Sequence, residues 1–385
     1  MNKKDPKLYR FNIANWLSIR NFKSIKSMDL KCKRINIFIG KPNVGKSNIL
    51  EAISLLGIAY EKNDNHFLSS FIRYEDLENI FYDNDTTNPV HISCNLGSGF
   101  ISYNSLSERF NLGIVPLSRK YEEENRFMLD LGFNEWNRFI NILDSQKNTD
   151  DIDLKSGSSD LTFFYASLTP YGKIVKNKDE KAIKSQGYVA SPVKKYDFEK
   201  LNKHENRFPY FLYPPHGNNL YSIVQEVVEL YPEISPMFEN YGLELVLRTK
   251  DRKFEVQKKK GGIVFTYPYS STADTLQRII FYLTAIKSNN DSVLILEEPE
   301  ANSFPPYTGM LADLISKDQN NQYFISTHSP YLLNTLLENT AIDELNLFVS
   351  NFDSYETKIR QLNHDEIKDI LSDSIDVFFN LERYF

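Results

Sequence analysis

The sequence predicts an α/β protein, and three features carry this prediction. An apolar stretch (residues 34–39, RINIFI) leads into a glycine-bounded turn and then into a helix with apolar side chains three and four positions apart. Two further apolar runs, at 293–296 and 322–326, end in acidic or polar residues, which is typical of parallel strands buried on both faces. Residues 16–33 alternate apolar and polar side chains. We therefore expect a mixed sheet core preceded by an N-terminal antiparallel β unit.

The composition narrows the class of protein. The chain has 385 residues, 41% of them hydrophobic and 14% aromatic, which is enough for two or three units with cores. Its formal net charge of −6 excludes a general nucleic-acid binder, so any DNA contact must come from a local patch. The two cysteines, Cys32 and Cys94, exclude a disulfide framework and a cysteine-rich zinc site. Because no apolar run reaches roughly 18 residues and the N-terminus is polar, we expect a cytoplasmic protein without membrane contact.

The turn after the first apolar stretch predicts a nucleotide site. Residues 40–47 (GKPNVGKS) match the pattern G-x-x-x-x-G-K-[ST] of a phosphate-binding loop. In such a loop, backbone N–H groups close on phosphate oxygens, Lys46 reaches the β- and γ-phosphates, and the Ser47 hydroxyl binds Mg²⁺. The following helix adds its positive N-terminal end to the same site. The predicted contacts with ATP are Gly40, Pro42, Asn43, Val44, Gly45, Lys46, Ser47 and Asn48.

The ends of the two later apolar runs predict the catalytic groups. Glu297 and Glu298 directly follow the run 293–296, where open α/β sheets bind their ligands. We expect Glu297 to bind Mg²⁺ through water, and Glu298 to orient and deprotonate the water that attacks ATP. His328 follows the neighbouring run and can reach the γ-phosphate. Lys46, Glu298 and His328 form the predicted catalytic set.

The middle of the chain has a less regular pattern. Residues 121–143 carry apolar side chains at helical spacing. The lysine-rich stretch 173–205 is interpreted as a surface excursion, with nucleic-acid contact as the alternative. Asp150, Asp151 and Asp153 form an acidic cluster, which is either a solvated loop or a carboxylate metal site.

Residues 243–267 give the clearest strand pattern. Their alternation predicts a three-stranded antiparallel meander with turns at 250–252 and 260–262. The outward positions and turns carry the strongest basic patch of the sequence, which faces either solvent or else DNA, RNA or an acidic partner. The patch consists of Arg248, Lys250, Arg252, Lys253, Lys258, Lys259 and Lys260.

Several motifs together resemble one family. NFKSI (21–25) precedes GKPNVGKSNILEAI, and LILEEPE and STHSP follow far downstream. This set resembles the ABC-type ATPase heads of the SMC, RecF and OLD group, in which a large insertion separates the phosphate loop from the glutamate pair. The resemblance implies an ABC-type P-loop fold in three parts. These are an ATPase lobe with the phosphate loop (1–120), an inserted helical and surface-loop region (121–242), and a part with the meander, signature-like helix and catalytic acids that completes the core (243–385).

The resemblance also implies that a second subunit completes the site. In such heads, a signature segment of one subunit closes over the nucleotide of the other. The matching segment is 269–278, in which Ser271 would contact the γ-phosphate across a homodimer or higher homo-oligomer. Residues 272–274 (TAD) replace the glycines that are usual there, so the segment departs from the family's pattern. Arg20 and Lys23 lie where the first strands of such heads contact nucleotide phosphates.

The resemblance is strongest to stand-alone OLD-like ATPase subunits of bacterial phage-defence systems such as the PARIS and Abi types. It implies an ATP- and Mg²⁺-dependent subunit that controls a separately encoded effector, a nuclease or a toxin. Only 57 residues follow His328, too few for the Toprim domain of OLD nucleases, so we expect any nuclease to be another chain. The alternative is a RecF-like DNA-repair protein. A transporter ATPase is disfavoured because the signature glycines are missing.

Overall fold

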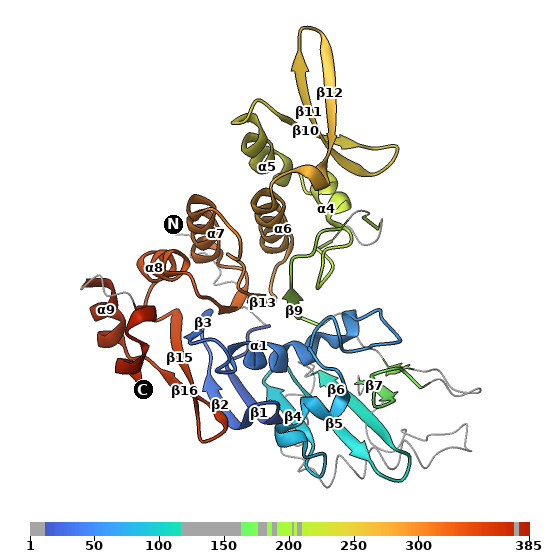
Figure 1. The fold of residues 1–385 in the computed structure, drawn as a ribbon, viewed down its shortest axis with the longest axis vertical. Coiled ribbons are helices and arrows are strands. Elements are labelled where there is room, and N and C mark those ends of the chain that lie inside the picture. Colours follow the sequence, from blue (N-terminus) through green and yellow to red (C-terminus); the bar gives the residue numbers. More distant parts are fainter. Residues whose placement is uncertain are drawn as a thin grey trace, which may run out of the picture.

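Three β-sheets organise the protein (Figure 1). The computed structural model describes residues 12–116, 163–175, 183–186, 191–201, 204–205, 210–372 and 377–385. The first sheet has the strand order β16-β15-β3-β14-β13-β9, and all its neighbours are parallel except β15 and β16. This arrangement confirms the predicted mixed sheet. Its strands are β3 (Ile35–Gly40), β9 (Val193–Tyr196), β13 (Val293–Glu297), β14 (Gln322–Ser326), β15 (Leu345–Asp353) and β16 (Glu356–Gln361).

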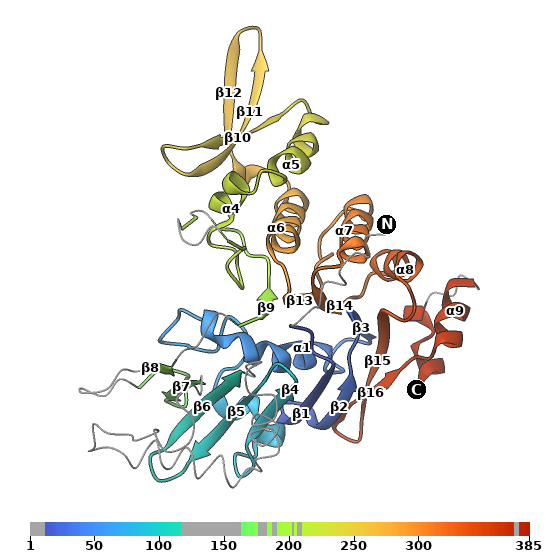
Figure 2. The same ribbon diagram turned by 180° about the vertical axis from the view of Figure 1, so that it is seen from behind.

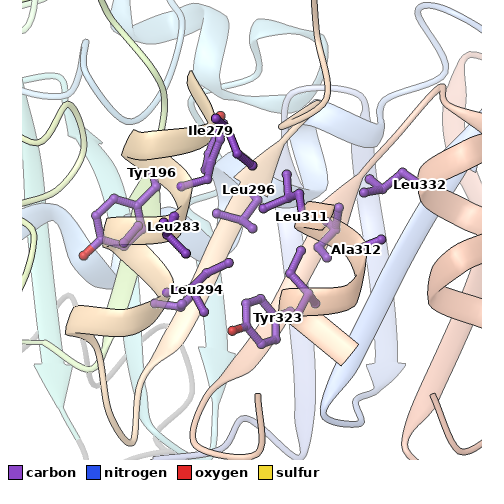
Figure 3. Close-up of a cluster of buried hydrophobic side chains, with 14 of the residues drawn as sticks. Tyr196, Ile279, Leu283, Leu294, Leu296, Leu311, Ala312, Tyr323 and Leu332 are labelled. Atoms are coloured by element: carbon purple, nitrogen blue, oxygen red, sulfur yellow. The ribbon is translucent and has the colours of Figure 1, made fainter. Parts of the chain in front are cut away.

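Both faces of this six-stranded sheet are covered, because alternate side chains of each strand enter different cores. Leu294 and Leu296 pack under helices α6 (Asp274–Ser288) and α7 (Pro305–Lys317) (Figure 3). Val293 and Ile295 point the other way, into the core that contains α1. The remaining helices on the first face and at the C-terminal end are α8 (Pro330–Asn339) and α9 (His364–Ser372), and α1 spans Lys46–Ser54.

A seven-stranded antiparallel sheet lies beyond α1 (Figures 1 and 2). Its strand order is β2-β1-β4-β5-β6-β7-β8. It confirms the predicted antiparallel unit ahead of β3, and it continues through the β4–β5 hairpin. Two 3₁₀ turns, Leu77–Ile80 and Tyr82–Asn84, lie between α1 and β4. The strands are β1 (Trp16–Phe22), β2 (Ile25–Lys31), β4 (Val90–Cys94), β5 (Gly97–Asn104), β6 (Arg109–Pro116), β7 (Phe163–Leu168) and β8 (Ile183–Gln186).

The third sheet projects from the opposite end of the molecule (Figure 1). We call residues 244–268 the arm; it consists of β10 (Glu244–Arg248), β11 (Lys253–Lys260) and β12 (Ile263–Pro268), as the alternating pattern predicts. Helices α4 (Leu220–Glu226) and α5 (Leu230–Glu239) lie at its base. Gly261 and Gly262 join β11 to β12 with φ angles of 56° and 81°. Two positive φ values define the type I′ turn that suits a two-residue hairpin.

One expectation about the middle region is wrong. Residues 193–196 form not a surface excursion but β9, a buried edge strand that pairs parallel with β13. Lys194 is tolerated there because its Nζ donates to Asn289 Oδ1 (2.6 Å) and Ser292 Oγ (2.9 Å) while its stem packs in the interior. The predicted helix at 121–143 and the cluster at 150–153 lie outside the described residues. In the part of the chain that is described, no helix is long and apolar enough to cross a membrane.

Candidate nucleotide site

The phosphate loop lies where β3 ends and α1 begins. β3 ends at Gly40, and α1 starts at Lys46, so the loop delivers the helix N-terminus to the carboxyl edge of the parallel strands. Gly45 precedes the helix with φ 92°, a conformation that side chains disfavour. A Cβ added there would lie 1.9 Å from Thr357 Oγ1. Glycine is therefore required at position 45 both by the positive φ angle and by the close approach of the Thr357 side chain.

Two other segments brace the start of α1. Asn48 Nδ2 donates to Ser24 Oγ (2.7 Å), and the Ser24 and Thr357 hydroxyls lie 2.6 Å apart. The Thr357 backbone N–H also donates to the Ser24 carbonyl (2.7 Å). Ser24 belongs to the turn between β1 and β2, and Thr357 to β16. The loop conformation is thus held from both the seven-stranded and the six-stranded sheet.

Lys46 provides the central cation of the loop. Its Nζ donates to the carbonyl oxygens of Gly40 (3.0 Å) and Lys41 (2.8 Å), and the side chain is buried. Burial lowers the pKa of Lys46 to about 8, although the carboxylates of Glu298 and Glu297 oppose this shift. A buried ammonium beside a helix N-terminus is an anion site, because phosphate charge replaces the water that the cation has lost.

The predicted catalytic acids lie close to the predicted histidine at the same edge of the sheet. β13 and β14 are adjacent and parallel, so Glu298 and His328, which follow them, lie close together: His328 Nε2 is 3.4 Å from Glu298 Oε1. Glu298 has φ 41°, and its N–H donates to the Ser326 carbonyl (3.0 Å). Such backbone strain in a side-chain-bearing residue is common at functional sites. Burial lowers the pKa of His328, as does the nearby Lys46 cation, while Glu298 opposes them, so the imidazole is neutral at pH 7.

Arg73 and Glu51 belong to this site but were not predicted from the sequence. The Glu51 carboxylate on α1 is fully buried and accepts from Arg73 Nε (2.6 Å) and from Lys23 Nζ. Arg73 Nη2 also donates to Glu297 Oε1 (3.0 Å). Arg73 therefore connects the phosphate-loop helix to the predicted metal ligand Glu297. The only signal in the sequence is an acidic residue among the apolar positions of α1.

Glu300 is a further missed residue. It accepts hydrogen bonds from Thr327 Oγ1 (2.6 Å) and from the His328 backbone N–H (3.0 Å). Burial raises its pKa, and these hydrogen bonds oppose the shift. Glu300 therefore fixes the loop that carries His328. The sequence shows a third glutamate in LILEEPE, but its partner Thr327 is 27 positions away and no local pattern reveals it.

The residues around Glu297 fit a magnesium ion that is shared with phosphates. α1, whose first turn carries Ser47, packs against β13, which ends at Glu297. In the described part of the chain, no group of three or more His, Cys, Asp or Glu residues could hold a metal alone. A hydroxyl and one carboxylate are the partial donor set that Mg²⁺ uses when nucleotide phosphates and waters supply its other ligands.

Of the other residues predicted to contact nucleotide, some lie beside the site and some are held elsewhere. Lys23 is next to the site through its pair with Glu51 and its bond to the Arg73 carbonyl (2.6 Å). The Arg20 guanidinium is held within the β1–β2 hairpin, on Asp29 (2.8 Å) and two carbonyls. In the phosphate loop, Pro42 and Asn43 are exposed and Val44 is buried.

The signature-like segment lies between the arm and α6. Ser271 Oγ donates to the Pro268 carbonyl (2.6 Å), at the end of β12. Thr275, in the first turn of α6, donates to the Asn302 carbonyl (3.0 Å). This contact links the segment to the loop that follows Glu297 and Glu298.

This combination of a β3–loop–α1 unit with acids and a histidine at the ends of adjacent parallel strands defines a P-loop ATPase of ABC type. A family comparison agrees: the model described as "AAA ATPase domain" matches residues 15–333, so the chain belongs to this ATPase family and hydrolyses ATP. RecF, the DNA replication and repair protein of Phocaeicola vulgatus, is 25% identical over 180 residues. That alignment covers 44% of this chain and 46% of RecF, so the chain spans about half the length of this relative.

Solved SMC heads are similar in outline. An SMC head with an extended coiled coil, bound to the C-terminal domain of ScpA from Pyrococcus furiosus, has a TM-score of 0.48 at 11% identity. The alignment covers 94% of this chain and 99% of that one. The SMC head domain from Thermotoga maritima gives 0.37 at 11% identity, covering 91% and 99%. The fold assignment rests on the topology described above.

Proposed function

We propose that this ATPase assembles through heads that sandwich ATP, and that its nucleotide state controls a separately encoded nuclease or toxin in bacterial anti-phage defence, in the cytoplasm. The observation that carries the proposal is the meeting of Lys46, Glu298 and His328 at one sheet edge. The motifs' resemblance to OLD-like defence ATPases supports the effector role. The Thr275–Asn302 bond supports communication between the catalytic edge and the segment that would contact a second head.

Each residue has a distinct part in the proposed reaction. Lys46 and the α1 N-terminus bind the phosphates, while Ser47 and Glu297 would hold Mg²⁺, which would supply positive charge to the phosphates. Glu298 accepts the proton of the attacking water, and His328 donates a hydrogen bond to the γ-phosphate. Ser271 of a second copy completes the site. Arg73 must share or release Glu297 when the metal binds, because it occupies one carboxylate oxygen.

The proposal is tested with Glu298→Gln, which keeps the shape of the side chain and removes the base. We expect hydrolysis to fall about 10²- to 10⁴-fold while ATP remains bound. Light scattering should then show an ATP-dependent increase in mass, and the co-expressed product of the neighbouring gene should co-purify in a nucleotide-dependent way. Adding Lys46→Ala to the same variant should prevent the increase. Unchanged hydrolysis in Glu298→Gln would show that another group is the base.

A RecF-like DNA-binding function is the second candidate, favoured by the RecF similarity and the basic arm. The structure partly neutralises that arm: Arg248 pairs with Asp251 (2.9 Å) and Glu255 (2.6 Å), and Lys259 pairs with Glu244 (2.7 Å). DNA binding would require ATP and would weaken steeply with salt.

Charge reversal separates the two functions. Lys258→Glu with Lys260→Glu should abolish DNA binding if the protein is RecF-like and leave effector control unchanged if it is not. Lys317→Glu is the matched control, because this lysine is exposed on α7, away from the arm. Equal losses in both variants would exclude the arm as the DNA contact.

A further inference from the structure

Strand β12 is unusual for a strand at the surface. All six of its residues, IVFTYP, are exposed, including Ile263 (60%), Val264 (51%), Phe265 (43%) and Tyr267 (45%). It carries no charge, and five of its residues are β-branched or aromatic. Soluble proteins normally protect such strands with lysine, an inward charge or a bulge, because uncharged apolar edges pair with other chains. This edge therefore has the properties of an interface.

The backbone of β12 is also available for pairing. Among the residues that the structure describes, its only strand neighbour is β11, so one side of β12 is an edge. The type I′ turn at Gly261-Gly262 makes Lys260 and Ile263 a hydrogen-bonded pair, and the pattern alternates from there. Ile263, Phe265 and Tyr267 thus use their N–H and C=O groups toward β11. Those of Val264 and Thr266 point outward.

We propose that β12 pairs antiparallel with β12 of a second copy of this chain, so that two arms form one six-stranded sheet. A two-fold axis at Phe265 places Val264 opposite Thr266 of the second copy, and both residues have outward N–H and C=O groups. The same register places Phe265 opposite Phe265, and Ile263 opposite Tyr267 of the second copy. These are apolar cross-strand pairs of the kind that stabilise antiparallel sheets.

The charge distribution favours a second copy as the occupant. The lysines of the arm tip, Lys258 to Lys260, lie on β11 opposite residues 263–265. In an antiparallel pair, the two tips point to opposite ends of the joint sheet, so these lysines stay apart. The paired strands themselves carry no charge, and identical strands meet without repulsion. Pro268, which lacks an N–H, lies beyond the proposed hydrogen-bonded pairs.

This contact differs from the proposed ATP sandwich, because it requires no nucleotide. It also lies beside the signature-like segment: Tyr267 lines a cavity of about 610 Å³ that Ser271 and Thr272 also line. Two different two-fold contacts in one chain generate closed rings or longer assemblies rather than a simple dimer. If the arms already hold two copies together, ATP binding would therefore change the number of copies in the assembly.

The first test measures mass without nucleotide. We expect the chain, and its Lys46→Ala variant, to have about twice the 44.9 kDa of one copy. Val264→Lys combined with Thr266→Lys places like charges opposite each other and should weaken the dimer at least tenfold. Val264→Lys combined with Thr266→Glu places opposite charges there and should retain it. A monomer in the unmodified chain, or equal behaviour of the two double variants, would overturn the proposal.

Cysteine crosslinking tests the register. In an antiparallel pair, opposed residues that are not hydrogen-bonded have Cα atoms about 4.5 Å apart, within the range of a disulfide. Phe265→Cys should crosslink two copies on oxidation, and so should Ile263→Cys combined with Tyr267→Cys. Ile263→Cys alone should not, because its counterpart is four residues away. Absence of crosslinking in Phe265→Cys would overturn the pairing.

Discussion

Strands β3 and β12 have similar composition and opposite surroundings. Both have six residues that are mostly β-branched or aromatic, yet every residue of β3 is buried and every residue of β12 is exposed. β3 lies between the helical layer of α6 to α8 and the layer of α1. β12 lies at the edge of an arm in which only the inner residues of β10 and β11 contact helices. Apolar composition thus specifies a strand, whereas its neighbours decide whether it forms a core or an interface.

Charged groups differ between the two regions in the same way. Near β3, the carboxylate of Glu51 is fully buried and pairs with Lys23 and with the partly exposed Arg73. On the arm, charged groups form exposed pairs, such as Lys259 with Glu244. Breaking a buried pair costs about 3–5 kcal/mol, whereas an exposed pair contributes about 0–1 kcal/mol. Substituting the charged residues around β3 should therefore destabilise the protein more than substituting those of the arm.

The largest expected effect comes from Lys46→Ala. The variant removes the central cation of the phosphate loop, so ATP binding should be lost, which calorimetry can measure. Lys41→Ala is the control within the same loop, because Lys41 is exposed and pairs with Glu382 at the surface (2.7 Å). We expect nearly unchanged affinity in that control. Comparable losses in both variants would mean that overall loop charge, rather than the position of Lys46, determines binding.

A core substitution should have the next largest effect. Leu296, fully buried in β13, packs between the sheet and the helices (Figure 3). Leu296→Ala should lower the free energy of unfolding by about 2–5 kcal/mol, because it removes buried apolar surface and leaves a cavity. Urea denaturation of the nucleotide-free chain measures this value. A loss below about 1 kcal/mol would show that the core relaxes around the gap.

Much of the fold could be predicted because its signals are local. The apolar runs that became β3, β13 and β14, and the alternation in the arm, need only neighbouring residues. β9 could not be predicted, because Lys194 and Lys195 have the composition of a surface loop. Lys194 is stabilised by partners about 95 positions away, and such distant partners leave no pattern in the surrounding sequence.

In the candidate site, too, residues within local motifs could be predicted, whereas residues that act through distant partners could not. Motif spacing predicted Lys46, Glu298 and His328, and the parallel order of β13 and β14 brings them together. Arg73 and Glu300 were missed because each acts through partners that are distant in sequence, Glu297 and Thr327. The sequence also predicted the strands of the arm but not that β12 would be exposed on both faces, since exposure depends on packing.

The pH dependence of ATP binding should show an intermediate effect. The pKa of Lys46 in the folded protein is about 8, below its ordinary value of 10.5, so the free loop loses its cation as the pH rises above 8. ATP affinity should then fall about tenfold for each further pH unit. The unfolded chain keeps this proton up to higher pH, so the contribution of Lys46 to stability rises between pH 8 and 10.5. Lys46→Arg stays charged, and a flat affinity profile in that variant would identify Lys46 as the titrating group.

The smallest effect on folding should come from Phe265→Ala, the arm's counterpart of Leu296→Ala. Because Phe265 is exposed on a strand edge, its removal should change the unfolding free energy of the isolated chain by no more than about 0.5 kcal/mol. The substitution should instead change how the Tm depends on protein concentration. If β12 pairs with a second copy, the Tm of the unmodified chain rises with protein concentration, because association stabilises the folded state. In Phe265→Ala this rise should be reduced. A large, concentration-independent loss of stability would mean that β12 belongs to the core of the arm after all, and that its exposure does not mark an interface.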